Sequence, residues 1–225
     1  MPAGTNAPRP TALFDLDGVL THRDTMTRYV SQVLFRDWWR VPASIPGLIG
    51  IGLTRRAPGL RRIPAKALVQ VAMFGADREA VEERLREVGR EFASHREWIT
   101  VQAVAEARRR LSDGERVVVT TASAEPLARA LLDGVGLAEA ELVASGLSST
   151  GPFLGLGPHN YHEGKLAGLL AAGIRPPYVV VHTDSLADLP LMRASDRTVL
   201  VNPGAFAVAR AEAELGEAVS VARWT

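Results

Sequence analysis

Short runs of apolar, mostly β-branched residues recur along the chain, and between them apolar residues return every three or four positions. The runs cover residues 12–16, 116–121, 178–183 and 198–201. Their length and their Gly, Pro or Asp boundaries are typical of buried strands in a parallel sheet. Helical spacing occurs in residues 103–111, 125–132, 165–172, 186–193 and 205–215. This alternation predicts an α/β fold, a doubly wound parallel sheet with helices on both faces.

Residues 24–98 interrupt the alternation because they show helical spacing and no strand pattern. Prolines divide this stretch into three or four predicted helices, and Asp77 is a good N-cap for the last of them. We therefore expect an all-helical cap inserted after the first strand. The predicted domains are a first part of the core, 1–21, that begins with a disordered tail, a cap, 22–98, and the rest of the core, 99–225. Residues 141–156 are predicted to form a small hairpin.

Composition narrows the range of functions. The chain has 225 residues and no cysteine, which excludes disulfides, thiolate zinc sites and cysteine nucleophiles. The first ten residues lack the apolar stretch of a signal peptide, and no uncharged segment is long enough for a transmembrane helix. We expect a cytoplasmic protein whose oligomeric state the sequence does not indicate.

Charge is unevenly distributed although the net charge is only +1. Residues 22–75 contain nine Lys or Arg and two acids, a net charge of 9 − 2 = +7. This segment either attracts an anionic ligand or surface, which includes peripheral contact with a membrane, or is a solvated helical face. Nucleic acid is not expected as a partner because the basic residues lie in a cap beside a small cleft. Of the adjacent Trp38 and Trp39, we expect one to face inward and one outward.

Polar residues follow several predicted strands, at the edge where doubly wound sheets bind ligands. Asp15 and Asp17 follow the first strand and Asp184 the third. Thr120 and Thr121 end the second strand, and we favour Thr121 for ligand contact because it directly precedes a small turn. Lys165 opens a later helix.

These groups together suit phosphoryl transfer. Carboxylates that converge would repel one another without a cation, and ligation by oxygen alone suits Mg²⁺. A lysine and a hydroxyl beside such an ion can neutralise and hold a phosphoryl group. One aspartate can then attack phosphorus, and a second can act as general acid and base.

The motifs resemble those of the haloacid dehalogenase superfamily of phosphatases, with its Rossmann-like core. FDLDGVLTHRDT at residues 14–25 is similar to the first motif of that family. Thr121 in VVVTTAS, Lys165 in HEGKLAGLL, and Asp184 and Asp188 in HTDSLADLPLM follow in the family's order. The early helical insertion and the late DSxxDLPL pattern resemble the phosphoserine-phosphatase-like branch.

The resemblance implies a role for each matching residue. Asp15 would be the nucleophile and Asp17 the general acid and base, while Thr121 and Lys165 hold the phosphoryl group. Mg²⁺ would be bound by Asp15, by Asp184 and by the backbone carbonyl of Asp17, with Asp188 supporting these ligands. The remaining expected substrate contacts are Gly18, Asp24, Ala122 and Ser123. Thr183 and Ala187 stand where the family commonly has Gly and Asn. These two departures change residues that would orient the metal ligands, not the ligands themselves.

The predicted activity is thus Mg²⁺-dependent hydrolysis of a small phosphorylated metabolite or a phosphorylated lipid headgroup. A dehalogenase is one alternative, although Asp17 has no use in that chemistry. A phospho-accepting or non-catalytic phospho-ligand-binding protein is another. Two residues also have structural interpretations, because Asp24 could be the N-cap of the first cap helix and Asp188 could cap a helix containing Pro190.

Overall fold

The computed structural model describes residues 9–54, 62–150, 153–157 and 160–225. The expected disordered tail falls mainly on residues 1–8, outside the described ranges. The central sheet has the strand order β3-β2-β1-β6-β7-β8, and all its pairings are parallel. Its strands are β1 (Thr11–Phe14), β2 (Arg116–Ala124), β3 (Glu141–Ser145), β6 (Val180–Thr183), β7 (Thr198–Val201) and β8 (Val219–Ala222).

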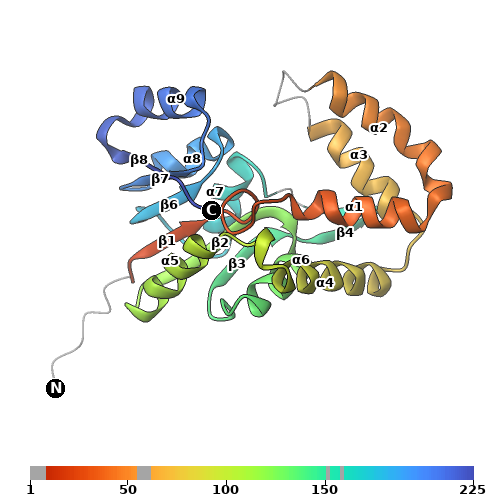
Figure 1. Cartoon of the computed structure of the whole chain (residues 1–225), viewed down its shortest axis with the longest axis horizontal. Coiled ribbons are helices and arrows are strands. Elements are labelled where there is room, and N and C mark those ends of the chain that lie inside the picture. The colour runs from red at the N-terminus through yellow and green to blue at the C-terminus, as the bar shows by residue number, and fades with distance from the viewer. Residues whose placement is uncertain (1–8, 55–61, 151–152, 158–159) are drawn as a thin grey trace.

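Helices cover both faces of this sheet, as predicted (Figure 1). They are α5 (Val101–Ser112) and α6 (Glu125–Gly134) on one face, and α7 (Glu163–Ala171), α8 (Leu189–Arg193) and α9 (Ala205–Leu215) on the other. The alternation of side chains along β1 explains the two layers: Phe14 packs in the cluster with α5 and α6, and Leu13 in the cluster with α7, α8 and α9. The doubly wound α/β fold is confirmed.

The helical insertion follows β1 and projects to one side of the sheet (Figure 1). It contains α1 (Thr25–Arg36), a short 3₁₀ turn (Trp38–Arg40), α2 (Val41–Leu53), α3 (Arg62–Met73) and α4 (Arg78–Ser94). Asp77 caps α4, its side chain accepting hydrogen bonds from the backbone N–H groups of Glu79 and Ala80. The chain leaves and re-enters the core side by side, since Thr21 forms an antiparallel bridge with Ile99. We place the two boundaries of the cap at this bridge.

Helix α4 is packed very closely on α6 of the core. A Cβ atom added to Gly89 would lie 2.3 Å from the carbonyl oxygen of Leu127, and one added to Gly134 would lie 2.4 Å from the Cβ of Ala93. One hydrophobic cluster runs from the sheet through this contact into α1 and α3 of the cap. The cap and the core therefore share a continuous apolar interior.

Several local expectations need correction. Residues 141–145 join the central sheet as β3, and the hairpin consists of β4 (Leu147–Thr150) and β5 (Phe153–Leu156). Strand β8 was not predicted, because its four residues do not form a continuous β-branched run and half of them are exposed. The helix predicted over 186–193 is divided into a 3₁₀ turn (Leu186–Asp188) and α8, with Pro190 in the first turn of α8.

Two expectations within the cap were also wrong. Pro46 lies inside α2 instead of ending a helix. Trp38 and Trp39 both face outward, with 76% and 58% of their surfaces exposed. No helix in the described ranges has the length and apolar character needed to cross a membrane.

Candidate active site

Asp15 and Lys165 meet at the carboxyl edge of the sheet. Asp15 directly follows β1, and its backbone N–H donates to the carbonyl of His182 on β6. Lys165 lies in the first turn of α7 with 3% of its surface exposed. Its Nζ atom is 2.8 Å from Oδ2 of Asp15 and 2.9 Å from Oδ2 of Asp188. A nearly buried ammonium group therefore joins two aspartates from different loops.

Burial and charge act in opposite directions on this cluster. Burial raises the pKa of Asp15 well above its ordinary value, Lys165 works to lower it, and the nearby carboxylates of Asp188 and Asp184 raise it further. Burial would lower the pKa of Lys165, but Asp15 and Asp188 outweigh it and raise that pKa. The lysine consequently remains charged and is the cation that favours ionised Asp15.

Asp17 has a different set of partners. Its Oδ1 accepts a hydrogen bond of 2.8 Å from the backbone N–H of Thr25, the first residue of α1. Its Oδ2 accepts one of 2.7 Å from the hydroxyl of Ser123 at the end of β2. Burial, followed by the negative charge of Asp24, raises the pKa of Asp17 to about 7, against the lowering effect of these hydrogen bonds. This carboxyl group can therefore exchange a proton near neutral pH.

Gly18 brings the loop after β1 against Asp184. Gly18 has a φ of +83°, and a Cβ atom there would lie 2.3 Å from Oδ2 of Asp184. Only glycine fits this close approach in this backbone conformation. Asp184 itself is exposed at the mouth of the site, yet desolvation by the surrounding protein and then the charge of Asp188 raise its pKa to about 6.

Asp188 is buried and bonded on two sides. Its Oδ2 accepts from Lys165 and, at 2.8 Å, from the hydroxyl of Thr183. Asp188 is the residue before α8, but its side chain makes no capping hydrogen bond, so the alternative interpretation as a helix cap is wrong. Thr183, which departs from the family pattern, thus orients the carboxylate that holds Lys165.

The two threonines lie within β2, which continues to Ala124, so the expected end of this strand at Thr121 was wrong. The Thr121 hydroxyl accepts a 3.0 Å hydrogen bond from the N–H of Ser123, where the pairing of β2 with β3 becomes irregular. The Thr120 hydroxyl accepts one of 3.1 Å from the amide of Asn160. Each hydroxyl thus has a partner within the protein, and the choice of Thr121 as the phosphate ligand stays a prediction. Ala122, whose carbonyl accepts from the Ser145 hydroxyl, is only partly buried.

Asn160 was missed by the sequence analysis. It has 4% of its surface exposed, and its Nδ2 donates to Thr120, to the carbonyl of Thr121 at 2.9 Å and to that of Val143 at 2.6 Å. It therefore ties β2 and β3 to the segment before Lys165. A polar residue in a Gly- and His-containing loop gives no signal of such burial in a single sequence.

Asp24 stands at the start of the cap. Its exposed side chain accepts a 2.6 Å hydrogen bond from the backbone N–H of Thr27 and caps α1. The N-cap interpretation of Asp24 is therefore confirmed. Its charge also acts on both Asp17 and Asp184, so it lies close enough to influence a ligand at this edge.

A comparison with models of protein families decides the family. Residues 12–193 match the model described as haloacid dehalogenase-like hydrolase. The chain belongs to this family. No protein among the curated ones matches it.

Solved structures similar to this haloacid dehalogenase-like hydrolase share its fold along nearly the whole chain. A Bordetella pertussis Tohama I protein of unknown function is 22% identical, with a TM-score of 0.58 and coverage of 96% of this chain and 99% of that one. A phosphoserine phosphohydrolase-like protein from Francisella tularensis is 14% identical, with a TM-score of 0.60 and 94% of each chain covered. The phosphoserine phosphatase of T. onnurineus is 16% identical, with a TM-score of 0.58 and coverage of 98% and 94%.

The donors at the edge of the sheet fit a magnesium ion. They are oxygens, as Mg²⁺ prefers, and Gly18 leaves the carboxylate of Asp184 uncovered where a side chain would block it. In the described part of the chain, no three His, Cys, Asp or Glu side chains are gathered to hold a metal. The carboxylate of Asp17 is bonded to Thr25 and Ser123, which leaves its backbone carbonyl as the third protein donor. The expected set of Asp15, Asp184 and the Asp17 carbonyl is compatible with this arrangement.

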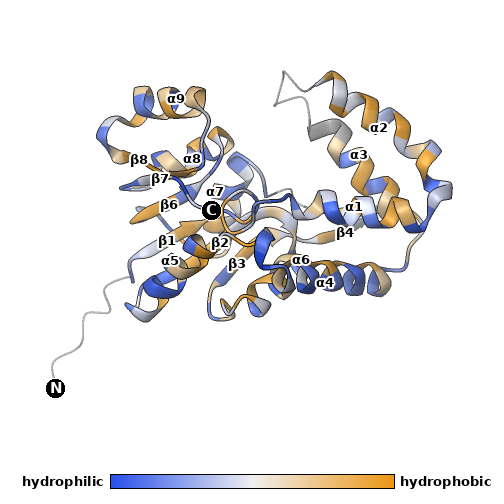
Figure 2. Ribbon diagram, in the orientation of Figure 1, coloured by the Kyte–Doolittle hydropathy of each residue, from blue (hydrophilic) through white to orange (hydrophobic). Residues whose placement is uncertain are grey.

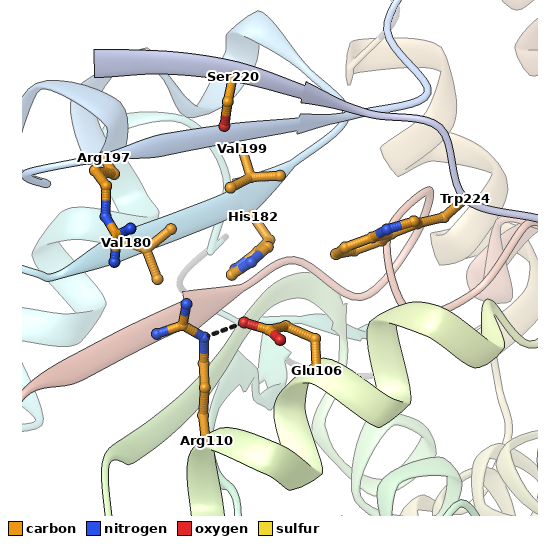
Figure 3. A pocket seen from close by; sticks show the side chains of 8 residues that line it. All are labelled: Glu106, Arg110, Val180, His182, Arg197, Val199, Ser220 and Trp224. Atoms are coloured by element: carbon orange, nitrogen blue, oxygen red, sulfur yellow. Dashed lines mark hydrogen bonds and ion pairs between the residues drawn. The ribbon is translucent and has the colours of Figure 1, made fainter. Parts of the chain in front are cut away.

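A cavity of about 190 Å³ lies away from these residues, between α5 and the outer strands of the sheet (Figure 3). His182 faces it from β6, stacked on Phe14 at 4.1 Å and beside Trp224 at 5.8 Å between ring centroids. Burial lowers the pKa of His182 to about 4, so its ring is neutral. Arg110 in the wall is already paired with Glu106. The cavity contains none of the aspartates of the carboxyl edge and is separate from the candidate site.

Proposed function

We propose that this protein hydrolyses phosphomonoesters through an aspartyl-phosphate formed on Asp15. The observation that carries the proposal is the contact between Asp15 and the buried ammonium group of Lys165, at 2.8 Å, on the sheet edge where Asp17 also lies. Membership of the hydrolase family supports it, as does the fold shared with phosphoserine phosphatases.

Asp15 is the group suited to attack phosphorus. Lys165 favours the ionised form of Asp15. The two carboxylate oxygens have different partners, because Oδ1 accepts from the backbone N–H of Leu16 and Oδ2 contacts Lys165. A carboxylate oxygen of Asp15 forms a bond to phosphorus while the bond to the alcohol oxygen of the ester breaks. The product is an acyl phosphate, which water then hydrolyses to inorganic phosphate and free Asp15.

Asp17 is the group suited to transfer protons. With a pKa of about 7 it carries a proton for part of the time at neutral pH and can give it to the departing alcohol oxygen. The resulting carboxylate can accept a proton from the water that attacks the acyl phosphate. The hydrogen bonds from Thr25 and Ser123 fix this carboxyl group in one orientation throughout.

The other expected residues would bind the metal and the substrate. Asp15, Asp184 and the Asp17 carbonyl would hold Mg²⁺, which supplies positive charge to offset that of the phosphoryl group. Thr121 and Lys165 would bind phosphoryl oxygens, with Ala122 and Ser123 beside them at the end of β2. Asp24 and Gly18 lie at the cap side of the same edge. We propose a small phosphorylated metabolite or a lipid headgroup as the substrate.

The test is release of inorganic phosphate from a panel of phosphomonoesters by the wild type and by Asp15→Asn. The wild type should release phosphate and form a covalent phosphoprotein that hydroxylamine cleaves, whereas the variant should do neither. Asp113→Asn is the matched control, because Asp113 is half-exposed at the end of α5 and far from the edge. Stable phosphorylation without release would indicate a phospho-accepting regulator, and halide release from a haloacid would indicate a dehalogenase. Undiminished turnover by Asp15→Asn would exclude Asp15 as the nucleophile.

A further inference from the structure

Helix α2 exposes most of its large apolar residues, whereas an ordinary surface helix buries them. In its 13 residues, all of them described, the buried positions are the small residues Ser44 and Gly47, and the helix packs on α3. Ile51 packs partly against the core, whereas the other large apolar residues, Val41, Ile45, Leu48, Ile49 and Leu53, are between 39% and 81% exposed. Positions 41, 45, 48, 49 and 53 form one stripe at helical spacing. The small residues allow α2 to pack on α3 while the large ones remain available outside.

More exposed apolar residues lie in the segment that directly precedes α2. Phe35 at the end of α1 is 93% exposed, and Trp38 and Trp39 follow it. We call these three residues and the outward stripe of α2 the apolar cap surface. Figure 2 shows α2 as a largely hydrophobic helix at the outer side of the cap, with α3 between it and the rest of the protein. Contiguous exposed apolar residues of this extent mark a surface that binds another body.

An exposed cation lies between Phe35 and the tryptophans of the apolar cap surface, and a second arginine supports them from below. Arg36 is exposed and has no ion-pair partner among the residues that the structure describes. Arg40 lies over the ring of Trp39, 4.4 Å from its centroid. The acid of this region, Asp37, is already paired with Arg40 at 3.2 Å and Arg84 at 3.8 Å. In sequence, residues 22–75 have a net charge of 9 − 2 = +7, of which Arg55, Arg56 and Arg61 lie outside the described residues. The charge of this segment of the chain favours an anionic partner.

We propose that the apolar cap surface binds the headgroup region of an anionic lipid bilayer. Adjacent exposed tryptophans next to arginines, followed by an uncharged apolar helix, are the composition of an interfacial membrane contact. At about 1.5 Å per residue α2 is ~20 Å long, so it can lie in the interface but is shorter than the ~30 Å hydrocarbon layer.

Hydrogen-bonding groups argue against a protein partner. Protein interfaces carry about one hydrogen bond per 100–200 Å² and a polar rim. The side-chain hydroxyls of α2 and its C-cap are already used within the helix: Ser44 donates to the carbonyl of Val41 and Thr54 to that of Gly50. Residues 41–54 contain no charged side chain. The surface therefore offers apolar contact beside the exposed cation Arg36, which an anionic bilayer matches. This proposal does not depend on the proposed reaction.

The test is flotation of the full-length protein with vesicles. One set contains phosphatidylcholine and phosphatidylglycerol, and the other phosphatidylcholine alone. The protein should float with the anionic vesicles and much less with the neutral ones, and added salt should weaken the binding. Replacing Arg36 by Gln should weaken it about fivefold, because a basic residue near such a surface contributes ~1 kcal/mol.

Two matched variants locate the contact. Leu53→Glu and Phe206→Glu each place a charge at a highly exposed apolar residue, 81% and 75% exposed, but Leu53 is on α2 and Phe206 on α9, at the opposite side of the molecule (Figure 1). Leu53→Glu should lower the partition coefficient about tenfold or more, from the apolar burial that it removes. Phe206→Glu should bind as the wild type does. Both should keep the wild-type melting temperature and the same kcat/KM on a soluble phosphomonoester.

Three results would overturn the proposal. They are failure of the wild type to float with anionic vesicles, equal flotation of Leu53→Glu and the wild type, and equal loss in both variants. Light scattering after size-exclusion chromatography provides a further check. If the wild type is a dimer that Leu53→Glu converts into a monomer, and neither floats, the surface is an interface between two copies of the chain.

Discussion

The hydroxyl of Ser123 donates a 2.7 Å hydrogen bond to Oδ2 of Asp17, although the two residues are 106 positions apart in the chain. The same hydroxyl lies 2.8 Å from that of Thr25, whose backbone N–H bonds the other oxygen of Asp17. The end of β2, the loop after β1 and the first residue of α1 therefore meet at one carboxyl group. The carboxyl group that we propose as the general acid and base is thus held by both the core and the cap.

Asp17→Asn should distinguish substrates by their leaving groups. The amide has nearly the same shape but cannot give a proton to the departing oxygen, so hydrolysis of alkyl phosphates should fall by ~10² to 10⁴-fold. An aryl phosphate, whose leaving group needs little protonation, should lose much less. The ratio of kcat/KM values for the two esters measures the effect. Equal losses on both would contradict the assignment of Asp17 as general acid.

Gly18→Ala should abolish activity, and Gly114→Ala should not. The two glycines have nearly the same positive φ, +83° and +80°, so an alanine strains the backbone similarly at both, by about 1 kcal/mol. A Cβ at Gly18 would collide with Asp184, whereas one at Gly114 would meet nothing within 4 Å. Thermal unfolding and kcat/KM should be compared for both variants. Similar activity in the two would show that the contact with Asp184 has no catalytic importance.

Removal of Mg²⁺ should abolish phosphate release, and its return should restore it. Binding to the native state alone also stabilises the fold, so added Mg²⁺ should raise the melting temperature, by mass action. Asp184→Asn should remove both responses, while Asp133→Asn, an exposed aspartate of α6, should keep them. Full activity in excess chelator would contradict a metal requirement.

Asp24→Ala should be compared with Asp77→Ala, because both residues cap a helix of the cap region. Each change should cost roughly 0.5–2 kcal/mol of stability through the lost capping hydrogen bond. The two differ in position, since Asp24 stands beside the candidate site. Asp24→Ala should lower kcat/KM for the preferred substrate and leave a generic aryl phosphate nearly unchanged. A loss shared by all substrates would leave Asp24 as a cap alone.

Strongly periodic or fully buried elements were predictable from the sequence, and the exceptions have physical reasons. Strands β1, β2, β6 and β7 are continuous apolar runs because helices cover both of their faces. Strand β8 lies at the edge of the sheet, so it needs no such run and gave no signal. Strand β3 could not be separated from the hairpin, because turn residues indicate a reversal of the chain but not which sheet a strand joins.

For the candidate site, charged residues that follow strands could be collected from the sequence, but their partners could not. Lys165 and Asp15 were expected at one edge, whereas the hydrogen bond of Thr183 to Asp188 and the three donated by Asn160 depend on side-chain directions. The outward position of both tryptophans also escaped prediction. Helical spacing normally assigns large apolar residues to the interior, but the fully buried positions of α2 are the small residues Ser44 and Gly47.

The glycine contact between α4 and α6 limits how this enzyme can open. A lid that swings as one body would have to separate Gly89 from Leu127 and Ala93 from Gly134, which are packed too closely for any side chain between them. Helix α4 is therefore held on the core, and α1 is tied to α4 in turn by the ion pair of Arg28 with Glu91. The cap is thus anchored to the core through one helix, whose close packing opposes an opening of the whole cap as a rigid body.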